Sequence, residues 1–307
     1  STGLRKGVVV KIEQTVQSIQ KALEEAELMA GCEIRSVYAG IAGSHIKGFN
    51  SHGVIAIKDG EVTPKDVERA MDAARAIAIP LDREVIHTLP QGYIVDDQRG
   101  ILDPLGMSGV RLEVHVHIVT GAVTSAQNMV RACHRSGLDV SDIVLESLAS
   151  GKAVLSQEER ELGVVLVDIG GGTTDIAILH NDAIKHTGVL ALGGQNLTND
   201  IAYGLRTPMV SAEDIKIKHG CALVDLVRPD EVIEVPSVGE REARPLSRQI
   251  LAAICQPRMV EILSLVDLEL TPSGYKNLAT AGVVLTRGTA PMAGCREVGQ
   301  AKFTLPT

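Results

Sequence analysis

The chain has 307 residues, 45% of them hydrophobic, so it can bury a substantial core, and its length predicts two domains or one large α/β unit with an insert. Its net charge of −8 argues against general nucleic-acid binding, which needs a surplus of Lys and Arg to neutralise phosphates. Two Phe, four Tyr and no Trp leave few platforms for stacking bases or sugars, so we predict an aliphatic core. We find no apolar run near the ~18 residues of a membrane-spanning helix. The five scattered cysteines, none in a CxxC pair, indicate reduced, buried thiols of a cytosolic protein.

In the first half of the chain, a stripe of apolar residues spaced by three or four predicts a helix over 12–30, ended by Gly31. Thr63 as N-cap and Pro64 at the first helical position predict a second helix. Segment 110–119 alternates as a strand does, with His115 and His117 on the outward face. Because no third ligand is evident nearby, we interpret these two histidines as exposed polar residues rather than metal ligands. We further expect strands at 34–41, 54–58, 84–88 and 92–95, a loop at 100–109, a helix at 125–136 and a closing segment at 143–155.

The second half opens with a strand at 163–169, whose β-branched and Leu residues predict burial on both faces. Strands at 174–179 and 183–192 complete an antiparallel meander. The remaining predictions are helices at 195–205 and 211–218, a strand at 231–235, a helical stretch at 245–270 interrupted near Pro257, a strand at 281–286 and a final helix ending near 302.

The strongest local signal is the loop that follows the 163–169 strand. Asp168 stands at the strand's end, and Gly170, Gly171, Gly172 and Thr173 follow. Glycines let the backbone turn tightly and bring amides against phosphate oxygens, and a strand-end carboxylate can hold the water shell of Mg²⁺. The alternative is an ordinary glycine-rich hairpin, for which three consecutive glycines are excessive.

Two weaker signals on predicted helices agree with this loop. Gly193 and Gly194 stand at a helix start, where amides can meet an anion. Glu213 and Lys216 lie three residues apart on one helix and could reach one edge of a ligand, although such a pair is usually a solvated ion pair.

A third weak signal is the turn at 286–290, which follows a buried strand and precedes a helix, as a nucleoside-contacting turn would. It contains Arg287 and Gly288. The signatures GxGxxG, GxxxxGK[ST], HExxH and GxSxG do not occur, so Rossmann, P-loop, zincin and α/β-hydrolase interpretations lack their defining motif.

Taken in order, VDIGGGTTD, LGGQNLTNDIA, SAEDIKIKHG and AGVVLTRGTAPMAG resemble the actin-like ATPase superfamily. STGLRKGVVVKIEQTVQSIQKALEEAE, YAGIAGSHIKGFNSHGVIAI and LESLASG resemble its FtsA family of bacterial cell-division proteins rather than actin, MreB or the heat-shock chaperones. The resemblance covers essentially the whole chain. It implies an α/β, actin-like (ribonuclease H-like) two-lobed fold around an ATP–Mg²⁺ cleft, with an α+β insert subdomain in the first lobe.

The resemblance also implies domain boundaries. These are 1–34 with 119–161 for the first lobe, 35–118 for the insert, 162–206 with 278–307 for the second-lobe core with its phosphate and adenosine loops, and 207–277 for an outer subdomain. The family's first phosphate loop would lie before Ser1, and its membrane-binding amphipathic helix after Thr307. We therefore expect a truncated chain that binds ATP weakly and cannot anchor itself.

By resemblance, the nucleotide contacts fall on Asp168, Gly170, Gly171, Gly172, Thr173, Gly193, Gly194, Glu213, Lys216, Arg287 and Gly288. Asp168 would hold Mg²⁺ through water, and Glu146 matches an acidic position that can orient an attacking water. Arg287 stands where the adenosine turn normally has glycine. Its guanidinium could stack on adenine, or a positive φ could strain it at a cost on the order of 1 kcal/mol. We favour strain, and expect Arg287→Gly to tighten ATP binding without changing its Mg²⁺ dependence.

The function that the resemblance implies is an ATP-binding scaffold that polymerises and tethers FtsZ to the inner membrane. The C-terminal tail of FtsZ would dock on 207–277, where Arg244, Arg248 and Arg258 supply charge, unless these are solvated helix surface. Later division proteins would bind the 35–118 insert. The protein would lie on the cytoplasmic face of the membrane at the division site, held by the C-terminal helix that this chain lacks, with no nucleic-acid partner.

Two alternatives remain open. A phosphotransferase of the same superfamily, such as a sugar kinase, would need a substrate-binding acid or base and a full first phosphate loop, neither of which we find. A pilus-assembly relative of FtsA would differ in its partner rather than its fold. We expect a structural protein with slow or no ATP hydrolysis.

Overall fold

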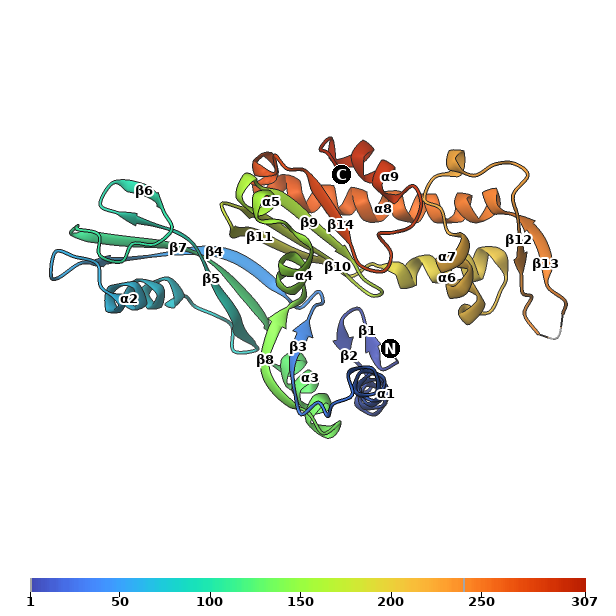
Figure 1. Cartoon of the computed structure of the whole chain (residues 1–307), viewed down its shortest axis with the longest axis horizontal. Helices are drawn as coiled ribbons and strands as arrows, with labels where there is room; N and C mark the ends of the chain where they lie inside the picture. Colours follow the sequence, from blue (N-terminus) through green and yellow to red (C-terminus); the bar gives the residue numbers. More distant parts are fainter. Residues whose placement is uncertain (1, 240) are drawn as a thin grey trace. The chain divides into compact units, whose positions relative to one another are not determined.

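A computed structural model of the chain describes residues 2–239 and 241–307 (Figure 1). The contacts divide it into two compact units. The first unit comprises Ser1–Glu161 and Ala177–Val189, and the second comprises Leu162–Ile176 and Leu190–Thr307.

The first unit begins with a short hairpin that we did not predict, formed by β1 (Leu4–Arg5) and β2 (Val8–Val9). As predicted, α1 (Ile12–Ala30) follows and ends at Gly31, whose φ of 67° is left-handed. Strand β3 (Ser36–Ile41) lies inside the predicted 35–118 insert, yet it pairs in parallel with β8 (Asp139–Leu145) outside it. The helices α3 (Val123–Arg135), α4 (Glu146–Val154) and α5 (Gln157–Leu162) complete this part of the chain.

Between β3 and α3, the chain forms a four-stranded antiparallel sheet in the order β4-β7-β5-β6. The helix α2 lies along one face of this sheet (Figure 1), and it begins with the predicted cap, in which the Thr63 hydroxyl accepts from the Asp66 amide at 3.3 Å. Of the residues predicted to face inward on the 110–119 strand, Leu112, Val114, Val116 and Ile118 are fully buried, but Val110 is 73% exposed and precedes the strand. The elements are β4 (Lys47–Ala56), α2 (Pro64–Arg75), β5 (Arg83–Val95), β6 (Gln98–Ile101) and β7 (Arg111–Ala122).

Two strand predictions in this sheet were wrong. The strands expected at 84–88 and 92–95 form the single strand β5, which crosses Pro90 with register shifts on either side of it. Residues 98–101, next to and partly within the predicted loop, pair with β5 as strand β6. Bulges let a strand accommodate residues that do not fit the regular ladder, so Pro90 did not end it.

The prediction that His117 is exposed was also wrong. Its side chain is 1% exposed, because the Nε2 atom lies 2.8 Å from the Thr187 hydroxyl and the Nδ1 atom 2.6 Å from Asn50 Oδ1. An amide oxygen can only accept, so Nδ1 carries the proton and Nε2 accepts from Thr187. His115 is exposed as predicted; it stacks on His52 and lies 2.9 Å from Glu113.

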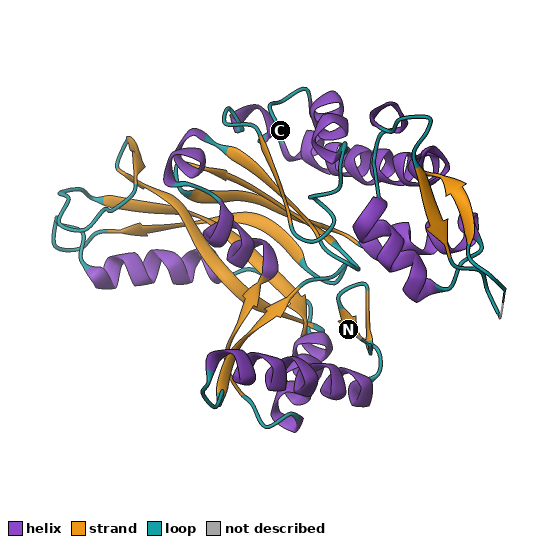
Figure 2. Cartoon of the chain, turned by 45° about the vertical axis from the view of Figure 1, so that its right-hand side comes forward, coloured by secondary structure: helices purple, strands orange, loops and turns teal. Residues whose placement is uncertain are grey.

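In the second unit, β9 (Val164–Ile169) is buried at all six residues, as predicted, and pairs in parallel with β14 (Val283–Thr286). The sheet order is β11-β10-β9-β14, with β10 (Thr174–His180) and β11 (Ala183–Leu190) as the predicted meander, of which residues 177–189 belong to the first unit. Figure 2 shows the helices and the hairpin that follow. They are α6 (Gly194–Leu205), α7 (Met209–His219), β12 (Val232–Val235), β13 (Arg244–Ser247), α8 (Arg248–Ser273) and α9 (Cys295–Phe303), with 3₁₀ turns at Val224–Leu226 and Lys276–Leu278.

The predicted interruption near Pro257 is absent, because α8 runs through this residue. A proline removes one hydrogen bond of the helix, but the flanking turns of α8 are held by buried side chains, among them Cys255 and Met259. Among the described residues, α8 is also the one helix long and apolar enough to cross a membrane. A core helix passes the same test, and eight α8 side chains are buried.

The predicted burial of the cysteines was right for four residues and wrong for one. All five thiols are free, and only Cys32 is exposed. Burial raises the pKa of Cys255 and of Cys295 to about 12, so both thiols are protonated and unreactive at neutral pH.

His117 should make the first unit sensitive to acid. Burial, and the nearby charge of His186, lower its pKa from 6.5 to about 4. Between these values the unfolded chain takes up a proton that the folded chain excludes, so stability should fall as the pH drops from 6.5 towards 4, by up to about 3 kcal/mol. Urea unfolding across this range should show the loss in the native chain and a clearly smaller one in His117→Gln. His115→Gln, an exposed change on the same strand, should behave as the native chain; equal acid sensitivity in all three would contradict the assignment.

Candidate functional site

The glycine loop after β9 begins at a buried carboxylate. Asp168 is 0% exposed and is paired in register with Thr286 of β14. The loop closes through a 2.9 Å hydrogen bond from the Gly170 amide to the Thr173 carbonyl, and the Thr173 hydroxyl donates to Asp175 at 2.9 Å. The loop is therefore a tight turn held from inside.

The second glycine pair docks directly on this turn. The Gly194 amide donates to the Gly170 carbonyl and the Gln195 amide to the Gly171 carbonyl, each at 2.8 Å, while the Gly193 amide donates to Asn196 Oδ1. These amides are thus used within the protein, and our expectation that they would meet an anion was wrong. Gly193 instead allows the two backbone segments to lie close together, since a Cβ there would lie 2.6 Å from the Gly170 carbonyl oxygen.

Glu213 and Lys216 of α7 meet, as predicted from their spacing, but they are not a solvated pair. The Lys216 ammonium is 9% exposed and donates to Glu213 at 2.8 Å, to the Thr198 hydroxyl at 3.0 Å and to the Gly194 carbonyl at 3.3 Å. Burial raises the pKa of Glu213, but hydrogen bonds from Lys216 and Thr198 outweigh it and hold the pKa below its usual value. Glu213 remains ionised and 42% exposed, so it can still accept hydrogen bonds from a ligand.

Thr198 is a residue that sequence reasoning missed. Its hydroxyl donates to the Glu213 carboxylate, accepts from the Lys216 ammonium at 3.0 Å and lies 3.0 Å from the Gly194 carbonyl oxygen. It lies four residues after Gly194, one turn along α6, and this spacing in LGGQNLTNDIA was the available signal.

The turn after β14 reaches the same loop. Arg287 has a φ of 75°, which confirms the positive φ that we expected, and its Nη1 lies 3.5 Å from Asp168 Oδ1. The Thr289 amide donates to the Ile169 carbonyl at 3.4 Å. A Cβ on Gly288 would meet no atom within 4 Å, so this glycine borders open space.

Glu146 is the first residue of α4, in the first unit. A Cβ on Gly40 of β3 would lie 3.3 Å from the Glu146 Cγ, so the glycine leaves room for this side chain. Its proposed role in orienting water stays a prediction.

The three arginines expected to bind an acidic peptide differ in how much charge they offer. Arg258 pairs with Asp200 at 2.6 Å and with Glu261, and Arg248 pairs with Glu231 at 2.6 Å. Both side chains are partly buried and paired. They therefore match neither of the two earlier interpretations, a solvated helix surface or an unpaired charge for an acidic peptide. Arg244 is exposed, and its guanidinium donates to the Leu205 carbonyl.

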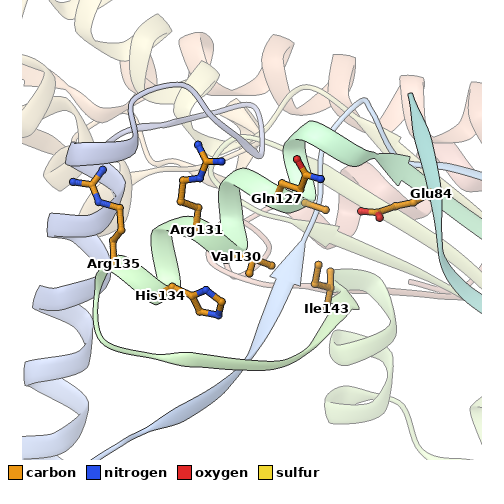
Figure 3. Close-up of a pocket in the computed structure, with 8 residues that line it drawn as sticks. Glu84, Gln127, Val130, Arg131, His134, Arg135 and Ile143 are labelled. Carbon is orange, nitrogen blue, oxygen red and sulfur yellow. The ribbon is translucent and has the colours of Figure 1, made fainter. Parts of the chain in front are cut away.

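A cavity of about 580 Å³ in the first unit lies outside these motifs (Figure 3). Gln127, Val130, Arg131, His134 and Arg135 of α3 line it, with Glu84 and Ile143 from β5 and β8. Arg135 is paired with Glu13 at 2.7 Å.

Two family models match the chain, one described as the SHS2 domain inserted in FTSA over residues 43–120 and one as Cell division protein FtsA over residues 165–307. The cell division protein FtsA of Pseudomonas aeruginosa is 56% identical over 306 residues, covering 100% of this chain and 73% of that protein. That of Escherichia coli K12 is 44% identical over 310 residues, covering 99% and 74%. The chain belongs to the FtsA family.

Solved structures support the actin-like fold. The PilM–PilN type IV pilus biogenesis complex matches with a TM-score of 0.67 at 17% identity, covering 99% of this chain and 76% of that one. MreB5 of Spiroplasma citri bound to ADP matches with a TM-score of 0.54 at 17% identity, covering 100% and 73%. The predicted fold class is therefore confirmed, and the FtsA family identifies a cell-division protein.

The residues of the second unit fit the ATP and Mg²⁺ that an actin-like fold implies. Cβ atoms on Gly171 and Gly288, from two different loops, would each meet nothing within 4 Å, so both glycines border open space. Amides of a glycine loop suit phosphates, and a strand-end carboxylate suits hydrated Mg²⁺.

The docking of the two glycine loops gives a stability prediction. Gly193→Ala should lower the free energy of unfolding by about 1–3 kcal/mol, because its Cβ would collide with the Gly170 carbonyl. The φ of −172° at Gly193 suits any residue, so backbone strain is not the cause. Gly171→Ala, whose Cβ has room, should stay within about 0.5 kcal/mol. Urea unfolding without nucleotide measures both, and equal losses would contradict the docking argument.

Proposed function

We propose that this FtsA-family chain binds ATP with Mg²⁺ in its second unit and acts as an actin-like scaffold in bacterial cell division. The observation that carries the proposal is the convergence of three loops and one helix around Asp168. The Gly194 amide joins α6 to the glycine turn, the Thr289 amide joins the β14 turn to β9, and Lys216 joins α7 to α6. Four motifs separated in the sequence thus lie together, which supports the proposal of one site.

Each group in this site has a chemical role in the proposal. Asp168 accepts hydrogen bonds from water around Mg²⁺, while Gly170, Gly171, Gly172 and Thr173 line the phosphates. The ionised Glu213, fixed by Lys216, accepts from ribose hydroxyls, and Gly288 leaves space for the adenosine. Bound Mg²⁺ neutralises part of the phosphate charge.

The proposed protein is a scaffold more than an enzyme, with slow or no ATP hydrolysis, and Glu146 is the candidate for orienting water. The 56% identity to an FtsA favours this role over a pilus-assembly relative, since the PilM–PilN complex is similar at 17% identity. It also favours the scaffold over a sugar kinase.

The proposed partners are other copies of the chain in a filament, later division proteins at the insert, and FtsZ. The insert is assigned to partners because its buried core is formed from its own residues, among them Leu112 and Ala70. The proposed location is the cytoplasmic face of the inner membrane at the division site.

For the C-terminal tail of FtsZ, the geometry favours Arg244 over Arg248 and Arg258, whose charges are paired within the chain. Arg244 donates to the Leu205 carbonyl. Residues before and after Leu205 in the chain line a cavity of about 410 Å³. Its lining residues are Ala202, Tyr203, Arg206, Thr207, Pro208, Met209 and Val238. Of these, Tyr203 is 84% and Val238 55% exposed, so an acidic peptide with apolar side chains would find both charge and apolar surface.

Nucleotide binding is tested at Glu213. Glu213→Gln should weaken ATP binding roughly fivefold to twentyfold, because a neutral amide accepts more weakly from ribose hydroxyls. Asp214→Asn, the same chemical change on the exposed face of α7, should have no effect. Calorimetry with ATP and with inorganic tripolyphosphate measures both variants. Tripolyphosphate has no ribose, so equal weakening of both ligands in Glu213→Gln would contradict the ribose assignment.

Partner binding is tested at Arg244. Arg244→Ala should weaken binding of a labelled peptide of the FtsZ C-terminal tail by about fivefold or more, with unchanged thermal stability. Arg258→Ala should instead lower the thermal stability, because it leaves the partly buried Asp200 without its guanidinium. Arg296→Ala, an exposed change on α9, serves as the control. Fluorescence anisotropy reports the affinities; unchanged peptide binding in Arg244→Ala would refute this docking site.

A further inference from the structure

Arg287 lies directly beside the carboxylate that the proposed site assigns to Mg²⁺. The parallel register pairs Thr286 with Asp168, so the next residue of the turn is adjacent to the end of β9. Its Nη1 is 3.5 Å from Asp168 Oδ1, with the arginine side chain 45% exposed and the carboxylate 0%. The pair therefore joins a partly exposed guanidinium to a fully buried carboxylate.

The same side chain reaches the glycine loop. A Cβ on Gly170 would lie 3.6 Å from the Arg287 Nη1 and 3.7 Å from its Cδ. The cation thus lies near both Asp168 and the first glycine of the loop, where the proposed site assigns both a phosphate and a hydrated metal ion.

We propose that Arg287 is a built-in counter-charge for Asp168 that makes nucleotide binding by this chain weakly dependent on divalent cations. The inference rests on the proposed ATP site. A guanidinium stays protonated at all physiological pH values and donates to carboxylate and phosphate oxygens alike. It therefore occupies an acceptor that metal-bound water would use, and it supplies positive charge to the phosphates when no metal ion is bound.

This inference replaces part of our expectation from the sequence. The positive φ of 75° does impose strain, but the side chain turns to Asp168 rather than to the space beside Gly288. Loss of the charge should therefore change the Mg²⁺ dependence, which strain alone would leave unaltered. The two effects can be separated, because Arg287→Gln keeps the strained backbone and removes the charge, whereas Arg287→Gly removes both.

The experiment compares ATP affinity in excess Mg²⁺ and in EDTA, by calorimetry on the complete gene product. In the native chain, EDTA should weaken ATP binding by less than about threefold. In both Arg287→Gln and Arg287→Gly it should weaken binding by more than about tenfold, since the positive charge of Arg287 is then missing beside Asp168. Arg296→Gln, which removes an exposed arginine from α9, should match the native chain. Circular dichroism confirms that each variant is folded.

Every outcome decides the proposal. The same Mg²⁺-to-EDTA ratio in the native chain and in both variants would overturn the role of Arg287 while leaving the ATP site intact. A changed ratio in Arg287→Gly alone would assign the effect to backbone strain and overturn it too. If no folded variant binds ATP in either condition, the proposed nucleotide site itself is wrong, and the inference is rejected with it.

Discussion

Two backbone hydrogen bonds, from the amides of Gly194 and Gln195 to the carbonyls of Gly170 and Gly171, hold the candidate site together. Each contributes only about 1 kcal/mol. Their structural effect is larger, because they fix the start of α6 against the turn that follows β9. Lys216 then bonds to the Gly194 carbonyl, so α7 takes its position from the same contact. Gly193 is needed at this junction, because a Cβ there would collide with the carbonyl oxygens of Gly170 and Gly171.

What could be predicted from the sequence was local. The cap of α2 depends on Thr63 and Asp66, three residues apart, and the buried face of β7 on alternation within one strand. His117 could not be predicted, because the partner that buries it, Thr187, is 70 residues away and outside the insert. Likewise α8 continues through Pro257 because tertiary burial of its side chains outweighs the lost hydrogen bond.

In the candidate site, too, local features could be predicted from the sequence and long-range contacts could not. The loop residues were predictable because glycine runs and a strand-end carboxylate have few structural uses, and the structure brings the motifs of the second unit together. The partners of the charged groups could not be predicted from the sequence. Arg258 and Asp200 are 58 residues apart, and Arg248 and Glu231 are 17 apart, so no spacing rule indicates that these arginines are paired. The amides at the start of α6 were misassigned for a similar reason, since only the fold reveals that they already have acceptors.

Arg287 shows how one position can satisfy opposing requirements. A left-handed φ costs a non-glycine residue on the order of 1 kcal/mol, which favours glycine. A carboxylate removed from water costs several kcal/mol, and a nearby cation recovers part of this. Asp168 is fully buried, and the arginine remains half exposed, so the pair gains attraction without burying a second charge. The compensation for Asp168 can thus exceed the strain at residue 287. The charge of Arg287 therefore accounts for an arginine at this position, and the strained backbone follows from placing that charge beside Asp168.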